Sequence, residues 1–190
     1  MGLLDIIDID TLLDAIRRQE ISTDAADPLA PMKDVNTVLS DKGAVGEMQI
    51  IPSMAMDPGY GIPTIFEVAA GLGFDVKDRS EAAARSLARD PAVAREYAKN
   101  YLMRAYDELG NVDAAVGSYN MGIPAMKSVL AGDRSLSTET RNYIPMVRHW
   151  YGETQQPYDF GVIPRPRGRP TPNAPSVSPR PQARPMGLLD

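Results

Sequence analysis

Apolar residues recur at helical spacing along most of the chain. Near its start, Leu12, Leu13 and Ile16 fall on one helical face, which predicts a helix that ends at Glu20. Asp10 is the expected N-cap of this helix. Because Glu20 lies four residues after Ile16, its carboxyl is carried on the apolar side, where poor solvation favours the neutral, proton-donating acid. From this segment alone, a solvated glutamate in the last turn is the alternative.

The same apolar spacing predicts several further helices between proline, glycine and capping residues. Their expected starts are Pro63, Ser80, Asp90, Asn111, Pro124 and Ser137. The longest is expected to end at Gly110, and the helix that starts at Pro124 is expected to stop at Gly132. Pro145 should kink the last helix or expose its carbonyl groups. Strand patterns are scarce, and Asp57-Pro-Gly-Tyr-Gly61 is typical of a turn. The pattern therefore predicts a mainly α protein.

The last part of the chain has a different composition. Residues 161–190 contain eight prolines and five arginines but few large apolar residues. This predicts a disordered or extended tail behind a folded domain of residues 1–160. The tail ends in Met186-Gly-Leu-Leu-Asp190, which repeats Met1-Gly-Leu-Leu-Asp5. A short docking motif and a processing junction are both compatible with the repeat.

Charge and composition exclude several kinds of site. Residues 1–160 carry 15 basic and 24 acidic side chains, which disfavours a nucleic-acid-binding domain. The chain has no cysteine and only one histidine, His149, so neither a disulfide framework nor a zinc site is expected. The first residues lack the basic and apolar pattern of a secretory signal, and no apolar run is long enough to cross a bilayer.

Four segments occur in a fixed order along the chain. They are the helix ending in Glu20, then Gly43-Ala-Val-Gly-Glu-Met-Gln-Ile-Ile-Pro52, Ser118-Tyr-Asn-Met-Gly122 and Asn142-Tyr-Ile-Pro-Met-Val147. This set resembles the soluble lytic transglycosylases, lysozyme-like enzymes that cleave bacterial peptidoglycan. That family shows a helix-terminal Glu-Ser, a Gly-x-Met-Gln-x-x-Pro segment, an Ala-Tyr-Asn-x-Gly segment and a late Tyr-Val element. The resemblance implies a lysozyme-like (goose-type) helical domain.

The resemblance implies a role for each matching residue. Glu20 is the catalytic acid and base. The substrate-binding residues are Ser22, Met48, Gln49, Tyr119, Asn120 and Tyr143. Met48 and Gln49 are expected to line the groove, Tyr119 and Asn120 to face the scissile bond, and Tyr143 to approach the glutamate. Two positions depart from the family pattern: Ile21 replaces the serine that follows the acid, and Glu47 replaces a small or apolar residue.

The implied chemistry needs one carboxyl group and no metal or other cofactor. A neutral glutamate protonates the glycosidic oxygen between the two sugars, and the N-acetyl oxygen of the substrate assists at C1. The C6 hydroxyl of the same sugar then closes a 1,6-anhydro ring and gives its proton to the ionised glutamate. One group that serves as acid and then as base needs a raised pKa.

The turn at Asp57-Pro-Gly-Tyr-Gly61, directly after the Met-Gln segment, resembles the transglycosylase domains of internal virion (ejection) proteins of short-tailed bacteriophages. It implies a virion protein that acts on the periplasmic cell wall, with peptidoglycan strands and other virion proteins as partners. An endolysin released through a holin would equally need no signal peptide. Contact of the tail arginines with DNA is a further alternative, although a tether is the simpler interpretation.

Other functions remain open at this point. A lysozyme-type hydrolase on the same fold would use water and a second carboxylate, for which Asp24, Asp27, Asp34 and Glu47 are candidates. A structural virion protein with weakened or lost catalysis would explain Ile21. Each groove residue also has a simple structural alternative, such as core packing for the two tyrosines or an exposed loop amide for Gln49.

Overall fold

The computed structural model describes residues 3, 7–24, 27, 29–34, 40 and 42–154. These residues form eight helices and two isolated β-bridges, and no longer strands occur among them. The helices are α1 (Ile9–Glu20), α2 (Pro52–Met56), α3 (Ile65–Gly71), α4 (Glu81–Arg89), α5 (Pro91–Leu109), α6 (Val112–Met121), α7 (Ile123–Ala131) and α8 (Thr138–Thr154). The mainly α class expected from the apolar pattern is confirmed.

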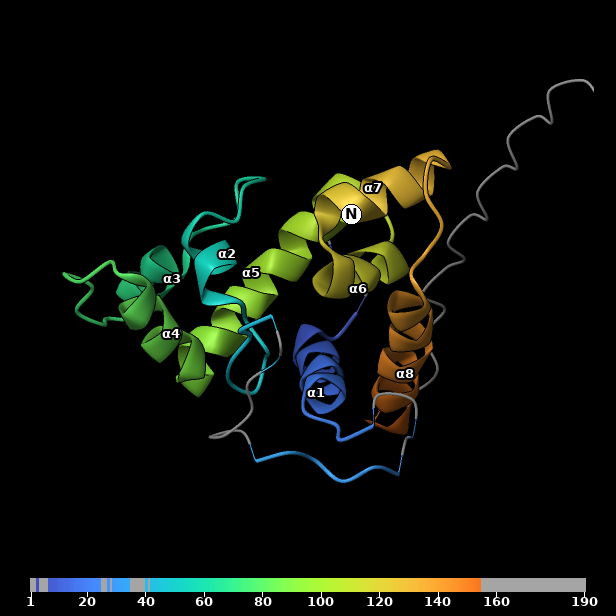
Figure 1. The fold of residues 1–190 in the computed structure, drawn as a ribbon, viewed down its shortest axis with the longest axis horizontal. Coiled ribbons are helices and arrows are strands. Elements are labelled where there is room, and N and C mark those ends of the chain that lie inside the picture. The colour runs from blue at the N-terminus through green and yellow to red at the C-terminus, as the bar shows by residue number, and fades with distance from the viewer. Residues whose placement is uncertain are drawn as a thin grey trace, which may run out of the picture.

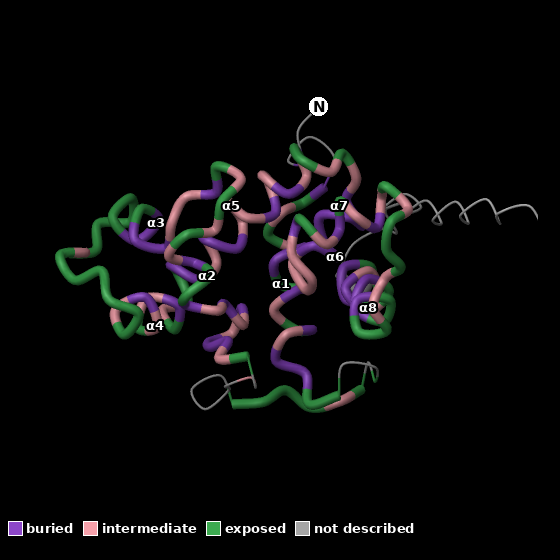
Figure 2. Tube along the Cα trace, turned by 45° about the horizontal axis from the view of Figure 1, so that its top comes forward, coloured by how far each residue is buried: buried purple, intermediate pink, exposed green. Residues whose placement is uncertain are grey.

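Helix α1 lies between two groups of helices (Figure 1). On one side it packs most extensively against α8, which also contacts α6. On the other side, α2, α3 and α4 pack together, and α3 and α4 also pack against the long α5. The buried parts of the trace gather where these helices meet, and the outer loops are exposed (Figure 2). The chain therefore presents two walls on either side of the C-terminal end of α1.

The apolar face of α1 is buried as the sequence predicts. Leu12, Leu13 and Ile16 are fully buried, and together with Val147 and Trp150 of α8 they belong to the main core. Burying three such side chains stabilises the fold by about 5 kcal/mol or more. This packing holds the last turn of α1, and so Glu20, against α8.

Local capping signals set most of the helix starts. Ser80, Asp90 and Asn111 each accept a hydrogen bond from a backbone N–H in the first turn of the helix that follows. Gly110 and Gly132 adopt left-handed conformations that end α5 and α7. These boundaries were all predicted from the sequence.

Two helix starts differ from the expectation. Asp8, not Asp10, caps α1, because its carboxylate accepts from the N–H groups of Asp10 and Thr11 at 3.0 and 3.1 Å. Asp10 is consequently inside the first turn, with its carboxylate turned to α5. Thr64, not Pro63, precedes α3 and forms a reciprocal capping box with Glu67.

Two prolines, Pro52 and Pro145, do not interrupt the helices in which they lie. Pro52 begins the short helix α2, which was not expected from the sequence. Helix α8 runs through Pro145 without ending. Because proline has no N–H, the carbonyl of Arg141 loses its helical partner, and both residues are exposed to water at this point.

The expected boundary at residue 160, the tail of residues 161–190 and its final repeat lie outside the described residues. Of the matching segment at the start, only Leu3 is described, and its side chain is buried in the main core. No helix of the described part is both long and apolar enough to span a membrane.

Candidate active site

Glu20 is the last residue of α1, and its side chain is half-buried beside α8. The Tyr143 hydroxyl donates a hydrogen bond of 2.6 Å to Oε1 of Glu20. Tyr143 is itself buried, with 5% of its surface exposed. The expected approach of this tyrosine to the glutamate is therefore present as a direct contact between the two helices.

The surroundings of Glu20 raise its pKa from the ordinary 4.5 to about 7. Burial is the largest cause, because it disfavours the charged carboxylate, and the nearby Glu139 carboxylate raises the pKa further. The Tyr143 hydrogen bond and the charge of Lys33 act in the opposite direction. At neutral pH both protonation states are populated, so this carboxyl can donate a proton and take one back.

Three contacts along α8 fix the orientation of α1. The indole N–H of Trp150 donates to Oε1 of Gln19 at 3.1 Å, and both side chains are buried. At the opposite end of α1, the N–H of Asp8 donates to the Tyr151 hydroxyl at 3.2 Å. Together with the Tyr143 contact to Glu20, these bonds hold α1 against α8. The position of the acid is thus set at both ends of its helix.

The segment of residues 43–51 forms the facing side of the site. Val45 and Ile50 exchange two backbone hydrogen bonds, of 2.9 and 3.1 Å, which close a tight loop. Within it, Gln49 has a φ of 45°, and its side-chain amide donates to the Gly46 carbonyl at 2.8 Å. A non-glycine residue in this region costs about 1–2 kcal/mol. Such strain at a cavity wall is characteristic of a functional position.

Tyr119 connects this loop to α6. Its hydroxyl donates to the backbone carbonyl of Met48 at 2.9 Å, and its ring meets that of Tyr101 edge to face with centroids 5.4 Å apart. The Tyr101 hydroxyl donates in turn to the Ser118 carbonyl at 2.8 Å. The Met48 side chain is fully buried in the core, so this residue contributes its carbonyl to the site and not the groove-lining side chain that was expected.

Asn120 connects α6 to α8 through both atoms of its amide. Its Oδ1 accepts from the Thr140 hydroxyl at 2.6 Å, and its Nδ2 donates to Oε1 of Glu139 at 2.9 Å. Thr140 and Glu139 were not predicted from the sequence. The available signal was spacing, because Glu139 lies four residues before Tyr143 and so on the same face of a helix.

Three adjoining cavities of about 330, 280 and 240 Å³ share Gln49 and Asn120 in their walls. The first two also share Glu20, Ser40 and Glu139 and are lined mainly by polar side chains. The third is lined by aromatic and apolar side chains, which include Tyr97, Tyr101, Tyr119, Ile51 and Met54. We call this row the groove: a polar end around the acid continues into an aromatic end.

The structure brings most of the predicted site residues to the groove. Its walls contain Glu20, Ser22, Gln49, Tyr119, Asn120 and Tyr143, but not the Met48 side chain. The Ser22 hydroxyl donates to the Asp24 carbonyl at 2.7 Å and therefore not to the acid. Ile21, which stands at the serine position of the family pattern, is buried. The catalytic and binding roles of these residues remain predictions.

Glu20→Gln should stabilise the protein at alkaline pH. A folded-state pKa of about 7 means that the folded chain binds the proton more tightly than the unfolded chain, so stability falls as pH rises from about 4.5 to 7. Removing this ionisation should raise the free energy of unfolding by about 2 kcal/mol at pH 8, after allowance for partial solvent screening. Urea unfolding at pH 5 and pH 8 measures the effect. An equal gain at both pH values would contradict a raised pKa.

Comparison with known proteins identifies the family of this chain. A family model described as "Transglycosylase SLT domain" matches residues 35–142, more than half of the chain. The matched range begins after Glu20, so the position of the acid rests on the geometry described above. A search among curated proteins gave no match.

Among solved structures, the chain is similar to an inactive mutant of the lytic transglycosylase Slt from Pseudomonas aeruginosa. The TM-score is 0.50 and the sequence identity 23%, over 77% of this chain and 22% of that one. The similarity shows a shared fold, and this chain spans about a fifth of the length of that structure. The family match confirms the resemblance to the transglycosylase SLT family that the motifs indicated. The chain belongs to the transglycosylase SLT domain family.

Proposed function

We propose that this domain is a peptidoglycan lytic transglycosylase in which Glu20 alone is the catalytic acid and base. The main support for the proposal is the environment of the Glu20 carboxyl. This group lines the groove, accepts a hydrogen bond from Tyr143 and has a pKa of about 7. The similar Slt structure is of an inactive mutant in which glutamine replaces a glutamate. By analogy, activity of this chain would depend on one glutamate, Glu20.

In the proposed reaction, neutral Glu20 donates its proton to the oxygen of the bond between N-acetylmuramic acid and N-acetylglucosamine. The C1–O bond breaks while the N-acetyl oxygen stabilises the positive charge at C1. The C6 hydroxyl of the muramic acid then attacks C1, and ionised Glu20 takes its proton. The products are a chain with a 1,6-anhydro end and a chain with a free 4-hydroxyl, and no water is consumed.

The remaining groove residues suit the binding of an uncharged sugar. The amides of Gln49 and Asn120 lie in the walls of all three cavities and can bond hydroxyl or N-acetyl groups. Because Asn120 is held by Thr140 and Glu139, its orientation is set before the substrate arrives. The aromatic end of the groove supplies apolar surface for a neighbouring sugar.

The products and a single substitution test this proposal. Digestion of purified peptidoglycan should release 1,6-anhydromuropeptides, detected by mass spectrometry. Glu20→Gln should reduce their rate of formation by about 10²- to 10⁴-fold, because the general acid and base are lost together. Glu81→Gln, at an exposed glutamate on α4 far along the chain from the site, is the matched control and should retain full activity. Equal activity of the Glu20 variant would remove this residue from its role.

The pH dependence should follow the protonation of Glu20. Because the acid must be protonated to begin the reaction, kcat/KM should fall above about pH 7. Tyr143→Phe removes a hydrogen bond that lowers this pKa, so the alkaline limb should move to higher pH while the maximum rate decreases. Rate measurements from pH 5 to 9 on both proteins check the direction. A limb that moves to lower pH would contradict the assignment.

A water-using muramidase is the second candidate, and one observation favours it. Asp24 and Glu139 line the same cavity as Glu20, so a second carboxylate is available beside the acid. Glu139 accepts a hydrogen bond from the side-chain amide of Asn120, another residue of the groove wall. The product analysis separates the two reactions, because hydrolysis leaves reducing ends without anhydro rings.

We infer further that the enzyme is a virion protein of a short-tailed phage that opens the cell wall during genome entry. The support is the sequence Asp57-Pro-Gly-Tyr-Gly61, in which Gly59, Tyr60 and Gly61 all have positive φ values. Other virion proteins would then be its partners. Mass spectrometry of purified particles of a phage that encodes the chain should find its peptides. Peptides found only in the lysed host would favour an endolysin.

A structural virion protein without activity remains the alternative to both enzymes. Purified particles that contain the chain, together with wild-type protein that releases no sugar product, would be its signature.

A further inference from the structure

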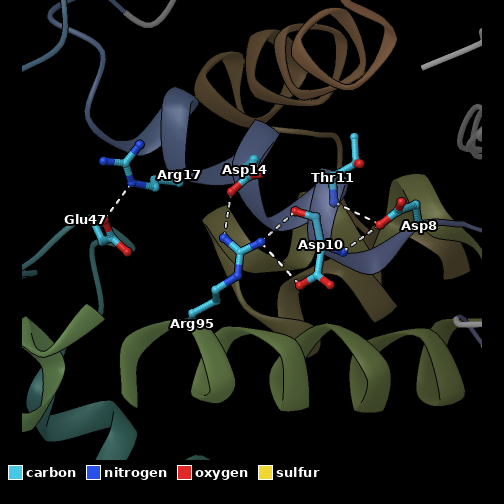
Figure 3. Close-up of polar contacts among 7 residues, drawn as sticks. All are labelled: Asp8, Asp10, Thr11, Asp14, Arg17, Glu47 and Arg95. Carbon is cyan, nitrogen blue, oxygen red and sulfur yellow. Dashed lines mark hydrogen bonds and ion pairs between the residues drawn. The ribbon is translucent and has the colours of Figure 1, made fainter. Parts of the chain in front are cut away.

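An ion pair joins α1 to the loop of residues 43–51. Nε of Arg17 lies 2.6 Å from Oε2 of Glu47, and the two side chains are 35% and 15% exposed (Figure 3). Arg17 lies one turn before Glu20 on α1, and Glu47 lies two residues before Gln49. Neither charged residue is among the described residues that line the groove. The pair therefore stands beside the groove and connects its two sides.

A second ionic contact holds the other end of the same helix. Nη1 of Arg95, on α5, lies 2.6 Å from Oδ1 of Asp14. Nη2 of Arg95 donates to the Asp10 carbonyl at 2.9 Å and lies 3.3 Å from its carboxylate. Asp10, Asp14 and Arg17 follow at spacings of four and three, so they share one face of α1. Figure 3 shows Arg95 reaching this face from α5 and Glu47 meeting it further along.

Glu47, the loop residue of the Arg17–Glu47 pair, lies between two residues whose positions are fixed. Gly46 lies so close to α4 that an added Cβ would come within 2.4 Å of the Ala88 carbonyl oxygen. Met48 is held by the hydrogen bond from Tyr119. Glu47 therefore stands between two anchored residues, and its carboxylate is a fixed point to which Arg17 can hold α1.

Arg17, the other member of the pair, is carried by α1. α1 packs most extensively on α8, and it has fewer contacts with α5. α8 is connected to the loop that carries Gln49 indirectly, through Asn120 and Tyr119 of α6, so a direct link from α1 to this loop would limit any shift between them. The Arg17–Glu47 pair opposes that shift at the turn nearest to the acid.

We propose that the Arg17–Glu47 ion pair is a positioning device that sets the distance across the groove between Glu20 and Gln49. The inference rests on the proposed function, because it takes Glu20 as the reacting acid and Gln49 as a sugar-binding residue. Misplacing a catalytic group by about 1 Å can cost about 10²-fold in rate, so a contact beside the site can matter without touching substrate. Glu47 departs from the small or apolar residue of the family pattern, so the device is a property of this chain.

The effect of the pair is geometric and not electrostatic. The main causes of the pKa shift of Glu20 are its burial, the Tyr143 hydrogen bond and the charges of Glu139 and Lys33, and neither member of the pair is among them. Breaking the pair should therefore change kcat and leave the alkaline limb of the rate profile near pH 7. This distinguishes it from a change in the charge around the acid.

The kinetic test uses Arg17→Met and Glu47→Gln, which remove the charge and keep the size of each side chain. Both should lower kcat on peptidoglycan by about tenfold, with a smaller change in KM. The alkaline limb of the pH–rate profile should stay where it is in the parent. Arg95→Met is the matched control, because it breaks a contact to the same helix face at the end remote from Glu20. It should leave kcat within about twofold. The exchanged double variant Arg17→Glu with Glu47→Arg should restore most of the activity.

A distance measurement tests the device independently of activity. The chain has no cysteine, so Ser53→Cys on α2 and Arg141→Cys on α8 can carry spin labels at exposed positions on the two walls. The distribution of label distances should broaden in Arg17→Met and stay as in the parent in Arg95→Met. Unchanged kcat or an unchanged distribution in Arg17→Met would overturn the proposal. If the parent released no anhydro product, the proposed function would fail. The label distances would still decide whether the Arg17–Glu47 pair sets the distance across the groove.

Discussion

The burial of one carboxyl group between α1 and α8 is the constraint on which the site depends. Glu20 would be charged at neutral pH in water, and its burial where these helices pack raises its pKa to about 7. Tyr143 gives the carboxyl a hydrogen bond in either protonation state, while Leu12 and Ile16 supply the apolar contacts that hold it there. The core thus stabilises an acid that weakens the fold at the pH where it would work.

The opposite side of the groove is ordered by polar contacts instead of apolar packing. Tyr119 holds the loop through the Met48 carbonyl, and Asn120 is held between Thr140 and Glu139. Hydrogen bonds have strict geometry, so these side chains occupy defined positions before any ligand binds. The strained backbone of Gln49 fits the same arrangement, because the surrounding loop holds it in place. A rigid wall that faces the half-buried acid can hold a sugar in a defined position.

Local interactions explain which features of the fold were predictable. The caps at Ser80, Asp90 and Asn111 lie within three residues of the N–H groups that they bind, so a short segment contains the whole signal. The start of α1 was misplaced because Asp8 and Asp10 are both suitable caps. The choice between them depends on where Arg95 and Tyr151 lie, since these residues bind the backbone of Asp10 and Asp8.

The sequence by itself determined the helical class, the end of α1 at Glu20 and the resemblance to lytic transglycosylases, because helical periodicity and short motifs are local properties. Only the tertiary structure decided which groups meet around the acid. Tyr143 is 123 residues from Glu20, and Arg17 is 30 residues from Glu47. Pairs at such separations are brought together by packing of the intervening helices, and no local pattern specifies them. The same packing buried the Met48 side chain, and it brought Glu139, which shares a helix face with Tyr143, to the acid.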